Sequence, residues 1–188
     1  GELLPQSLYQ GVMNTVKRLA NTTRLEIVQV ALKMFLERGY DKTSAKAICQ
    51  ELGISTGNLT YYFPTKEHIL AILVEMLCDF QWKTMEIALD EGGSHLMALC
   101  LELAAMAAIC EENKIAKDFY LSVYTHIMTL NTIRINDQKK AKKLFASYCT
   151  DWTDVDFASA EMLVSGIEYA TLKTTPCTPE LPVRLAAA

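Results

Sequence analysis

The sequence predicts an all-α protein, with a small helix-turn-helix head followed by a larger helical bundle. Apolar residues recur with the helical period along almost the whole chain, and no convincing alternating strand interrupts them. Glycine and proline are rare, at 8 and 5 of 188 residues, so long helices are permitted. Capping residues and glycines separate short helices near the beginning from longer ones beyond residue 64.

The expected helices begin at Ser, Thr, Asp or Pro and end at glycines or polar breaks. Gly39 and Gly53 end two of the early helices, and the run at 91–93 is a clear break further on. We expect helices over about 22–38, 43–52, 56–62, 64–89, 94–111, 114–130, 136–149 and 153–174.

Composition excludes several classes of protein. With 51% hydrophobic and 21% charged residues, the chain is ordinary globular protein rather than a disordered one. The longest apolar stretch, 96–110, is short and contains Glu102, and we find no secretory leader, so we expect a cytoplasmic protein without membrane contact. The six cysteines lack zinc or redox spacing, which favours reduced core thiols.

Charge is unevenly distributed along the chain. Residues 13–66 contain eight Lys or Arg against four acids, whereas 67–188 contain ten against seventeen. A basic head on an acidic body is typical of a protein whose head faces nucleic acid.

The sequences of the two ends of the chain suggest that they belong to one helix. Residues 179–188 stop in mid-helix, and joined to residues 1–12 they would form one plausible terminal helix. One hypothesis is that residues 1–12 belong structurally after Ala188. The alternative is a genuine amino-terminal arm with a truncated carboxyl end.

The residues around 44–63 have the pattern of a helix-turn-helix. Ala47 is small where two helices approach, Gly53 permits a left-handed turn, and Leu59 and Phe63 anchor the second helix by pointing inward together. The second helix then presents its amino end and outer face to a DNA major groove. The candidate base-contacting residues are Ser55, Thr56, Gly57, Thr60 and Tyr61, and the candidate phosphate contacts are Thr43, Ser44, Tyr62 and Lys66.

Over roughly residues 23–70 the sequence resembles the amino-terminal domain of the TetR (tetracycline-repressor) family of transcriptional regulators. The residues that match the family are Ala31, Phe35, Gly39, Tyr40, Thr43, Ile48, Gly53, Ile54, Ser55, Gly57, Leu59, Tyr62, Phe63, Lys66 and Glu67. One departure is Thr60, where the family usually carries a tyrosine that the adjacent Tyr61 replaces in part.

The resemblance implies phosphate contacts for Thr43, Tyr62 and Lys66, a DNA-binding domain over 13–65 and a ligand-binding and dimerisation domain over 66–188. Residues 1–12 would join the second domain if they belong to its terminal helix. The resemblance further implies a homodimer that reads a palindromic operator through double-stranded DNA contacts, and a repressor that a small ligand releases by swinging the helix from Lys66 to about Leu89.

The resemblance also implies an effector pocket in the body, between that long helix and residues 94–130, and the aromatic and methionine side chains there would make it largely apolar. The candidate lining residues are Phe80, Met97, Met106, Phe119, Tyr120, Tyr124 and His126, with Trp82, Met85, Met128, Tyr148 and Trp152 in a wider set. The run 139–143, with four lysines, is interpreted as a solvated helix face.

Other functions are weighed against this one. The three histidines lack metal-ligand spacing, and we find no nucleophile elbow, phosphate loop or catalytic His/acid motif, so we expect neither an enzyme nor a metal or other cofactor. The alternative function is a TetR-like DNA-binding protein without a small-molecule effector, controlled by a protein partner.

Overall fold

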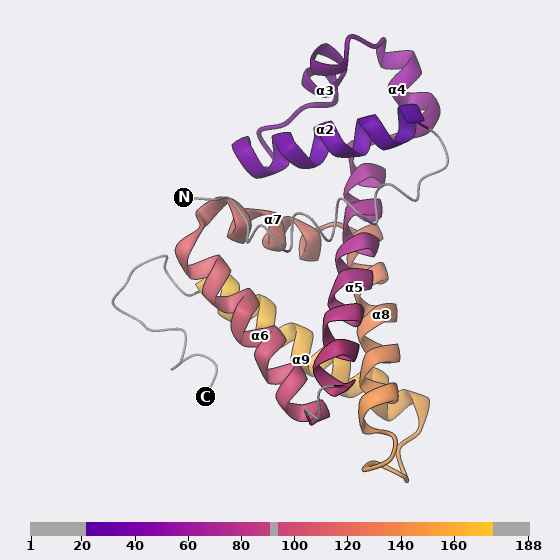
Figure 1. Ribbon diagram of the computed structural model, residues 1–188, viewed down its shortest axis with the longest axis vertical. Helices are drawn as coiled ribbons and strands as arrows, with labels where there is room; N and C mark the ends of the chain where they lie inside the picture. Colours follow the sequence, from indigo (N-terminus) through magenta and orange to yellow (C-terminus); the bar gives the residue numbers. More distant parts are fainter. Residues whose placement is uncertain (1–21, 91–93, 175–188) are drawn as a thin grey trace.

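The computed structural model describes residues 22–90 and 94–174, and within them every regular element is a helix (Figure 1). In chain order the helices are α2 (Thr22–Arg38), α3 (Ala45–Leu52), α4 (Thr56–Tyr62), α5 (Lys66–Asp90), α6 (His95–Glu112), α7 (Lys114–Thr125), α8 (Ile127–Phe145) and α9 (Asp154–Thr174). The all-α prediction is therefore confirmed. The hypothesis about residues 1–12 and 179–188 falls outside the described residues.

Local chemistry explains where the short helices of the head begin and end. The hydroxyls of Ser44 and Ser55 accept the backbone N–H groups of Ala47 and Asn58, which caps α3 and α4. Gly53 ends α3 at a φ of 65°, in the left-handed region that glycine adopts without strain. The two short helices are thus held at a fixed turn, as the spacing predicts.

The head and the beginning of the body share one apolar core. Ile27 and Phe35 of α2 and Ile48 of α3 are fully buried, and the same cluster continues through Ile69 of α5 to Val123 of α7. Helix α2 packs on both α5 and α7. Both α5 and α7 of the body therefore contact the head directly.

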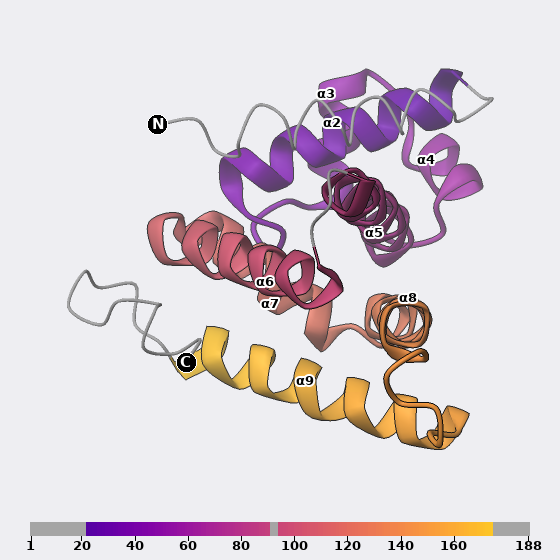
Figure 2. The ribbon, with the colours of Figure 1, turned by 60° about the horizontal axis from the view of Figure 1, so that its bottom comes forward.

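The body is a bundle of α5 to α9 beneath the head. Helices α5 and α8 run side by side, and α9 packs against α7 and α8 (Figure 1). Turned to the second view, the bundle has α9 along the side opposite the head helices (Figure 2). In the described part of the chain, the helices are all too short or too polar to cross a membrane.

The sequence-based boundary between α7 and α8 is wrong. One helix was expected over 114–130 and the next over 136–149, but the break falls at His126 and α8 already begins at Ile127. The hydroxyl of the buried Thr129 lies 2.5 Å from the Val123 carbonyl and 2.9 Å from that of His126. This side chain competes for the carbonyls at the end of α7 and so favours a break there.

Candidate nucleic-acid interface and ligand cavity

The amino-terminal end of α4 is an exposed polar surface at the far end of the head. Ser55, Thr56, Gly57, Thr60 and Tyr61 are all exposed, while Leu59 on the opposite side of the same helix is buried. Figure 1 shows α3 and α4 at the end of the molecule away from the body. The five residues proposed for base contact are therefore brought together on one accessible face.

Tyr61 is the large side chain of this surface. Its ring is 81% exposed and meets the half-buried ring of Tyr62 edge to face, with centroids 5.0 Å apart. The hydroxyl of Thr60 donates to the Gly57 carbonyl 3.1 Å away. Tyr61 therefore projects outward, whereas the hydroxyl proton of Thr60 is already bound within α4.

Two of the residues predicted to contact phosphate bond to backbone carbonyls of the protein itself. Thr43 is fully buried, its N–H bonds to the Tyr40 carbonyl and its hydroxyl donates to the Gly39 carbonyl at 2.9 Å, so it cannot reach a phosphate in this conformation. The Nζ of Lys66 donates to the Tyr40 carbonyl at 2.8 Å and lies 3.8 Å from the centroid of the Tyr40 ring. Burial lowers the pKa of Lys66, and the charges of Asp41 and Glu67 oppose that shift.

Exposed polar groups surround the start of α3, next to the buried Thr43. Ser44 is exposed, and the exposed ammonium groups of Lys42 and Lys46 belong to residues on either side of it. The first N–H groups of a helix lack intrahelical partners and favour an anion. The two lysines were counted in the charge of the head but not singled out, although their spacing around a helix start indicates this arrangement.

His126 lies at a joint between the head and the body. Its Nδ1 is 3.3 Å from Oε1 of Glu67 at the start of α5, and its ring meets that of Tyr40 edge to face at 5.2 Å. Lys66 also donates to the Tyr40 carbonyl. Three parts of the chain therefore meet at one point: the connection between α2 and α3, the start of α5, and the break between α7 and α8. His126, expected in the ligand pocket, belongs to this joint instead.

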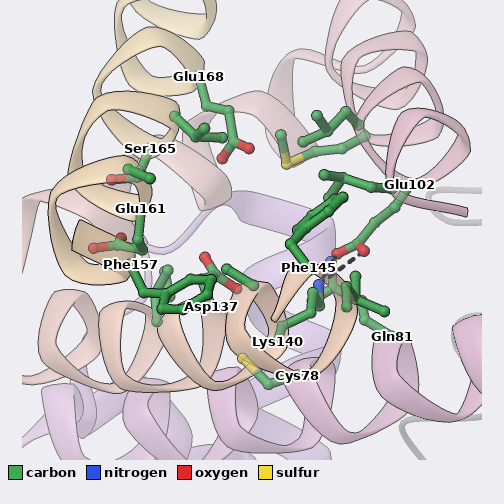
Figure 3. A pocket seen from close by; sticks show the side chains of 18 of the residues that line it. Cys78, Gln81, Glu102, Asp137, Lys140, Phe145, Phe157, Glu161, Ser165 and Glu168 are labelled. Carbon is green, nitrogen blue, oxygen red and sulfur yellow. Dashed lines mark hydrogen bonds and ion pairs between the residues drawn. The ribbon is translucent and has the colours of Figure 1, made fainter. Parts of the chain in front are cut away.

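The body contains a cavity of about 320 Å³ between α5, α6, α7, α8 and α9 (Figure 3). Most of its wall is apolar, with Leu77, Leu103 and Leu144 among the lining residues. Of the seven residues predicted for the pocket, Met106, Tyr120 and Tyr124 line it, and Trp152 does so from the wider set. Volumes of this size hold small molecules.

The other predicted lining residues lie outside the cavity. Phe80 is half-buried on α5, Met97 is exposed on α6, and Phe119 belongs to the core shared with the head. In the wider set, Trp82, Met85, Met128 and Tyr148 also do not line it. The prediction was wrong for these residues because α8 and α9, which it left out, form much of the cavity wall.

The cavity wall carries charged groups besides Glu102, the one acid of the apolar stretch 96–110. Lys140 is only 4% exposed and its Nζ lies 2.5 and 2.8 Å from the two carboxylate oxygens of Glu102. The lysine run suggested a solvated helix face, but Lys140 is buried and does not belong to one. The signal in the sequence was spacing, since Ile133, Asp137, Lys140 and Leu144 follow one another at three or four residues and all line the cavity.

Three further carboxyl groups, those of Asp137, Glu161 and Glu168, line the cavity. Burial raises the pKa of Asp137 to about 6 and that of Glu168 to about 7. Burial also raises the pKa of Glu161. The Tyr124 hydroxyl donates to Oε2 of Glu168 at 2.7 Å. The wall therefore combines apolar surface with titratable acids.

The head is similar in sequence to known regulatory proteins. Residues 27–73 match the family model described as bacterial regulatory proteins, tetR family. The HTH-type regulator YuxN of Bacillus subtilis is 43% identical over 58 residues, which is 31% of this chain and 19% of that protein. The HTH-type regulator UidR of Escherichia coli is 33% identical over 63 residues, 34% of this chain and 32% of that protein. The chain thus spans between a fifth and a third of the length of these relatives.

Solved structures share the fold over most of the chain, head and body together. A TetR/AcrR-family regulator from Thermobifida fusca superposes with a TM-score of 0.56 at 22% identity, over 89% of this chain and 93% of that one. The TetR-family repressor FadR of Thermus thermophilus, solved with lauroyl-CoA, superposes with a TM-score of 0.67 at 15% identity, over 87% and 89% of the two chains.

Proposed function

We propose that this chain, which belongs to the TetR family of bacterial regulatory proteins, is a DNA-binding transcriptional repressor that a small molecule releases from its operator. The observation that carries the proposal is the exposed face of α4, set on a head that matches the family. Proteins of this family are regulators rather than enzymes. Such a protein acts where the DNA is, so the proposal places the chain in the cytoplasm.

The proposed DNA-binding domain is 13–65 and the proposed ligand-binding and dimerisation domain is 66–188. Helix α4 would enter the major groove with its amino end first, so that Ser55, Thr56, Gly57 and Tyr61 reach base edges, with Thr60 beside them. Phosphate contacts are proposed for Ser44 and Tyr62, joined by the exposed Lys42 and Lys46.

A second copy of the chain is the proposed partner of α9. Val155, Leu163 and Ile167 expose 64% to 72% of their surface on this helix, and Gly166 has open space where a side chain would stand. An isologous pair of such faces would give a two-fold dimer whose two heads read a palindromic site. Leu163→Lys should therefore yield a monomer in sedimentation analysis and weaken operator binding, while Leu101→Lys on α6 should do neither.

The proposed mechanism couples the cavity to the head through α5. Val74, Leu77 and Cys78 of α5 line the cavity, and the first residues of the same helix form the joint with Tyr40 and His126. A ligand that favours one packing of α5 shifts the population of head positions and so changes the separation of the two recognition helices. FadR, which has the same fold, was solved with a small molecule bound, in support of this role for the body.

The experiment that tests the proposal is selection of random duplex DNA by the purified chain, with binding then measured against salt concentration. We expect enrichment of one palindromic sequence and a steep fall in affinity with salt, because phosphate contacts release counterions. Tyr61→Ala should change the enriched sequence. Weak binding without enrichment would contradict the proposal.

A further inference from the structure

We propose that the cavity of the body takes an organic cation, an amine or quaternary ammonium compound with an apolar portion, as the ligand of this regulator. The inference rests on the proposed function, since it names the class of effector, but its argument depends only on the groups that line the cavity.

The fixed charges of the wall leave an excess of acid. Glu102 and Lys140 form an ion pair and so neutralise each other. The carboxyl groups of Asp137 and Glu168 have no ion-pair partner among the described residues, whereas the charge of Arg134, outside the cavity, lowers the pKa of Glu161. No other lysine or arginine lines the cavity. A ligand that enters therefore meets the carboxyl groups of Asp137 and Glu168 and one ammonium group that is already paired.

The positions of these acids match a ligand between α8 and α9. The carboxyl groups of Asp137 and Glu168 point into the space between the helices (Figure 3). Glu161, from the α9 wall, is only 7% exposed, and its Oε1 is buried without a hydrogen-bond partner. A buried carboxylate oxygen without a partner is costly, so a donor or cation from outside the chain would stabilise this arrangement.

The rest of the wall fits the apolar part of such a ligand. The cavity is lined by the aromatic rings of Tyr120, Tyr124, Phe145, Trp152 and Phe157. Aromatic faces attract ammonium groups as well as hydrocarbon, and they do so more strongly where water is excluded. No group of three described His, Cys, Asp or Glu residues is placed to hold a metal ion, so these acids favour an extended organic cation.

The raised pKa values of Asp137 and Glu168 agree with the positions of these carboxyl groups in the cavity wall. The pKa of Asp137 is raised to about 6 and that of Glu168 to about 7 because burial penalises their charged forms. Lys140 opposes this shift, and it is the one ammonium group of the wall. A bound cation would favour the charged forms and so take the place of the missing partner.

The test uses three probes that share one carbon skeleton and differ in charge: 4-phenylbutylamine, 4-phenylbutan-1-ol and 4-phenylbutyrate. Their binding to the full chain without DNA is measured by calorimetry at pH 7.5. We expect the amine to bind about ten- to a hundredfold more tightly than the alcohol, as one charged hydrogen bond confers, and the acid to bind least. Binding of the acid or the alcohol as tightly as the amine, or binding of none of the three, would overturn the proposal.

Isosteric variants assign the effect to the acids. Asp137→Asn and Glu168→Gln should each weaken amine binding about tenfold and leave alcohol binding unchanged. Glu75→Gln, an exposed carboxyl group of α5 outside the cavity, is the matched control and should change neither. An unchanged preference for the amine in both cavity variants would overturn the assignment.

DNA binding of the same preparations is measured separately, which distinguishes the two proposals. Specific DNA binding without a preference for the amine overturns the cation inference and leaves the regulator proposal standing. A preference for the amine without specific DNA binding supports the cation inference and overturns the regulator proposal.

Discussion

The hydroxyl groups and aromatic rings of the head differ in role, and their burial distinguishes structural side chains from those on the proposed DNA surface. Thr43 lies just before α3 and Thr56 is the first residue of α4, yet Thr43 is fully buried and Thr56 is exposed. The hydroxyl of Thr43 lies 2.9 Å from the Gly39 carbonyl and 3.3 Å from that of Met34, so it ties the end of α2 to the beginning of α3. Its role is structural, whereas Thr56 belongs to the proposed DNA surface.

The substitution Thr43→Val keeps the shape of the side chain but removes these hydrogen bonds. We expect a loss of about 1–3 kcal/mol in the free energy of unfolding, because buried carbonyls lose their donor. Urea denaturation measures this loss, and Thr56→Val should leave stability nearly unchanged. A stable Thr43→Val variant with a reduced salt dependence of DNA binding would instead restore the phosphate role.

Tyr61 is expected to act on DNA without acting on stability. Because its ring is 81% exposed, Tyr61→Ala should change the free energy of unfolding by no more than about 0.5 kcal/mol. It should cost about 1–3 kcal/mol of discrimination at one base pair of the selected site, measured by competition with mismatched duplexes. Tyr148→Ala, which removes another exposed ring beyond the end of α8, is the control. Equal discrimination in both variants would contradict the docking of α4.

At the scale of the elements, the break between α7 and α8 positions the contact between head and body. Had one helix continued through residue 130, as the apolar period suggested, His126 would not lie at a break between two helices beside Glu67. The hydrogen bonds of Thr129 place that break. Local hydrogen bonds therefore have a long-range consequence, since the start of α5 contacts the end of α7.

The pair of His126 and Glu67 is expected to carry part of the coupling between ligand and DNA. His126→Gln and Glu67→Gln should each reduce the fall in operator affinity that a bound ligand causes. The double variant should reduce that fall no further than either single variant does. Fluorescence anisotropy of labelled operator, with and without 4-phenylbutylamine, measures this fall. Asp118→Asn, which breaks the exposed pair with Lys114 on α7, is the control. A full ligand effect in the double variant would assign the coupling to other contacts.

At the scale of the whole molecule, the buried acids link stability to pH. The folded protein holds the protons of Asp137 and Glu168 up to pH values of about 6 and 7, whereas in the unfolded chain they leave near their ordinary pKa values of 3.8 and 4.5. Between these limits the folded state binds more protons, so its stability falls as pH rises. The groups that face these two acids across the cavity are Glu102, Tyr124, Lys140 and Glu161.

We therefore expect the ligand-free chain to lose stability between about pH 4 and pH 7, as these two carboxyl groups ionise. The double variant Asp137→Asn and Glu168→Gln should lose much less over the same range. Urea denaturation at a series of pH values compares the two proteins, and parallel pH profiles would contradict the raised pKa values.

Much of the head could be predicted because its rules are local. The serine caps of α3 and α4 and the left-handed Gly53 depend on a few neighbouring residues, and the exposed face of α4 follows from the anchors Leu59 and Phe63. The surroundings of Thr43 and Lys66 could not be predicted, for the opposite reason. Their side chains bond to carbonyls of Gly39 and Tyr40, and only packing determines whether a polar side chain reaches an interior carbonyl or solvent.

The identity and order of the helices, the turn of the head and its resemblance to a family were present in the chain as periods, caps and spacings. The ligand cavity was not, because it forms where α5 to α9 enclose a common space. A charged residue on a helix is solvated by default, and only neighbouring helices bring Asp137, Lys140 and Glu168 inside. Apolar and aromatic residues alone predicted an apolar pocket, whereas three-dimensional packing added the acids that give the cavity its charge.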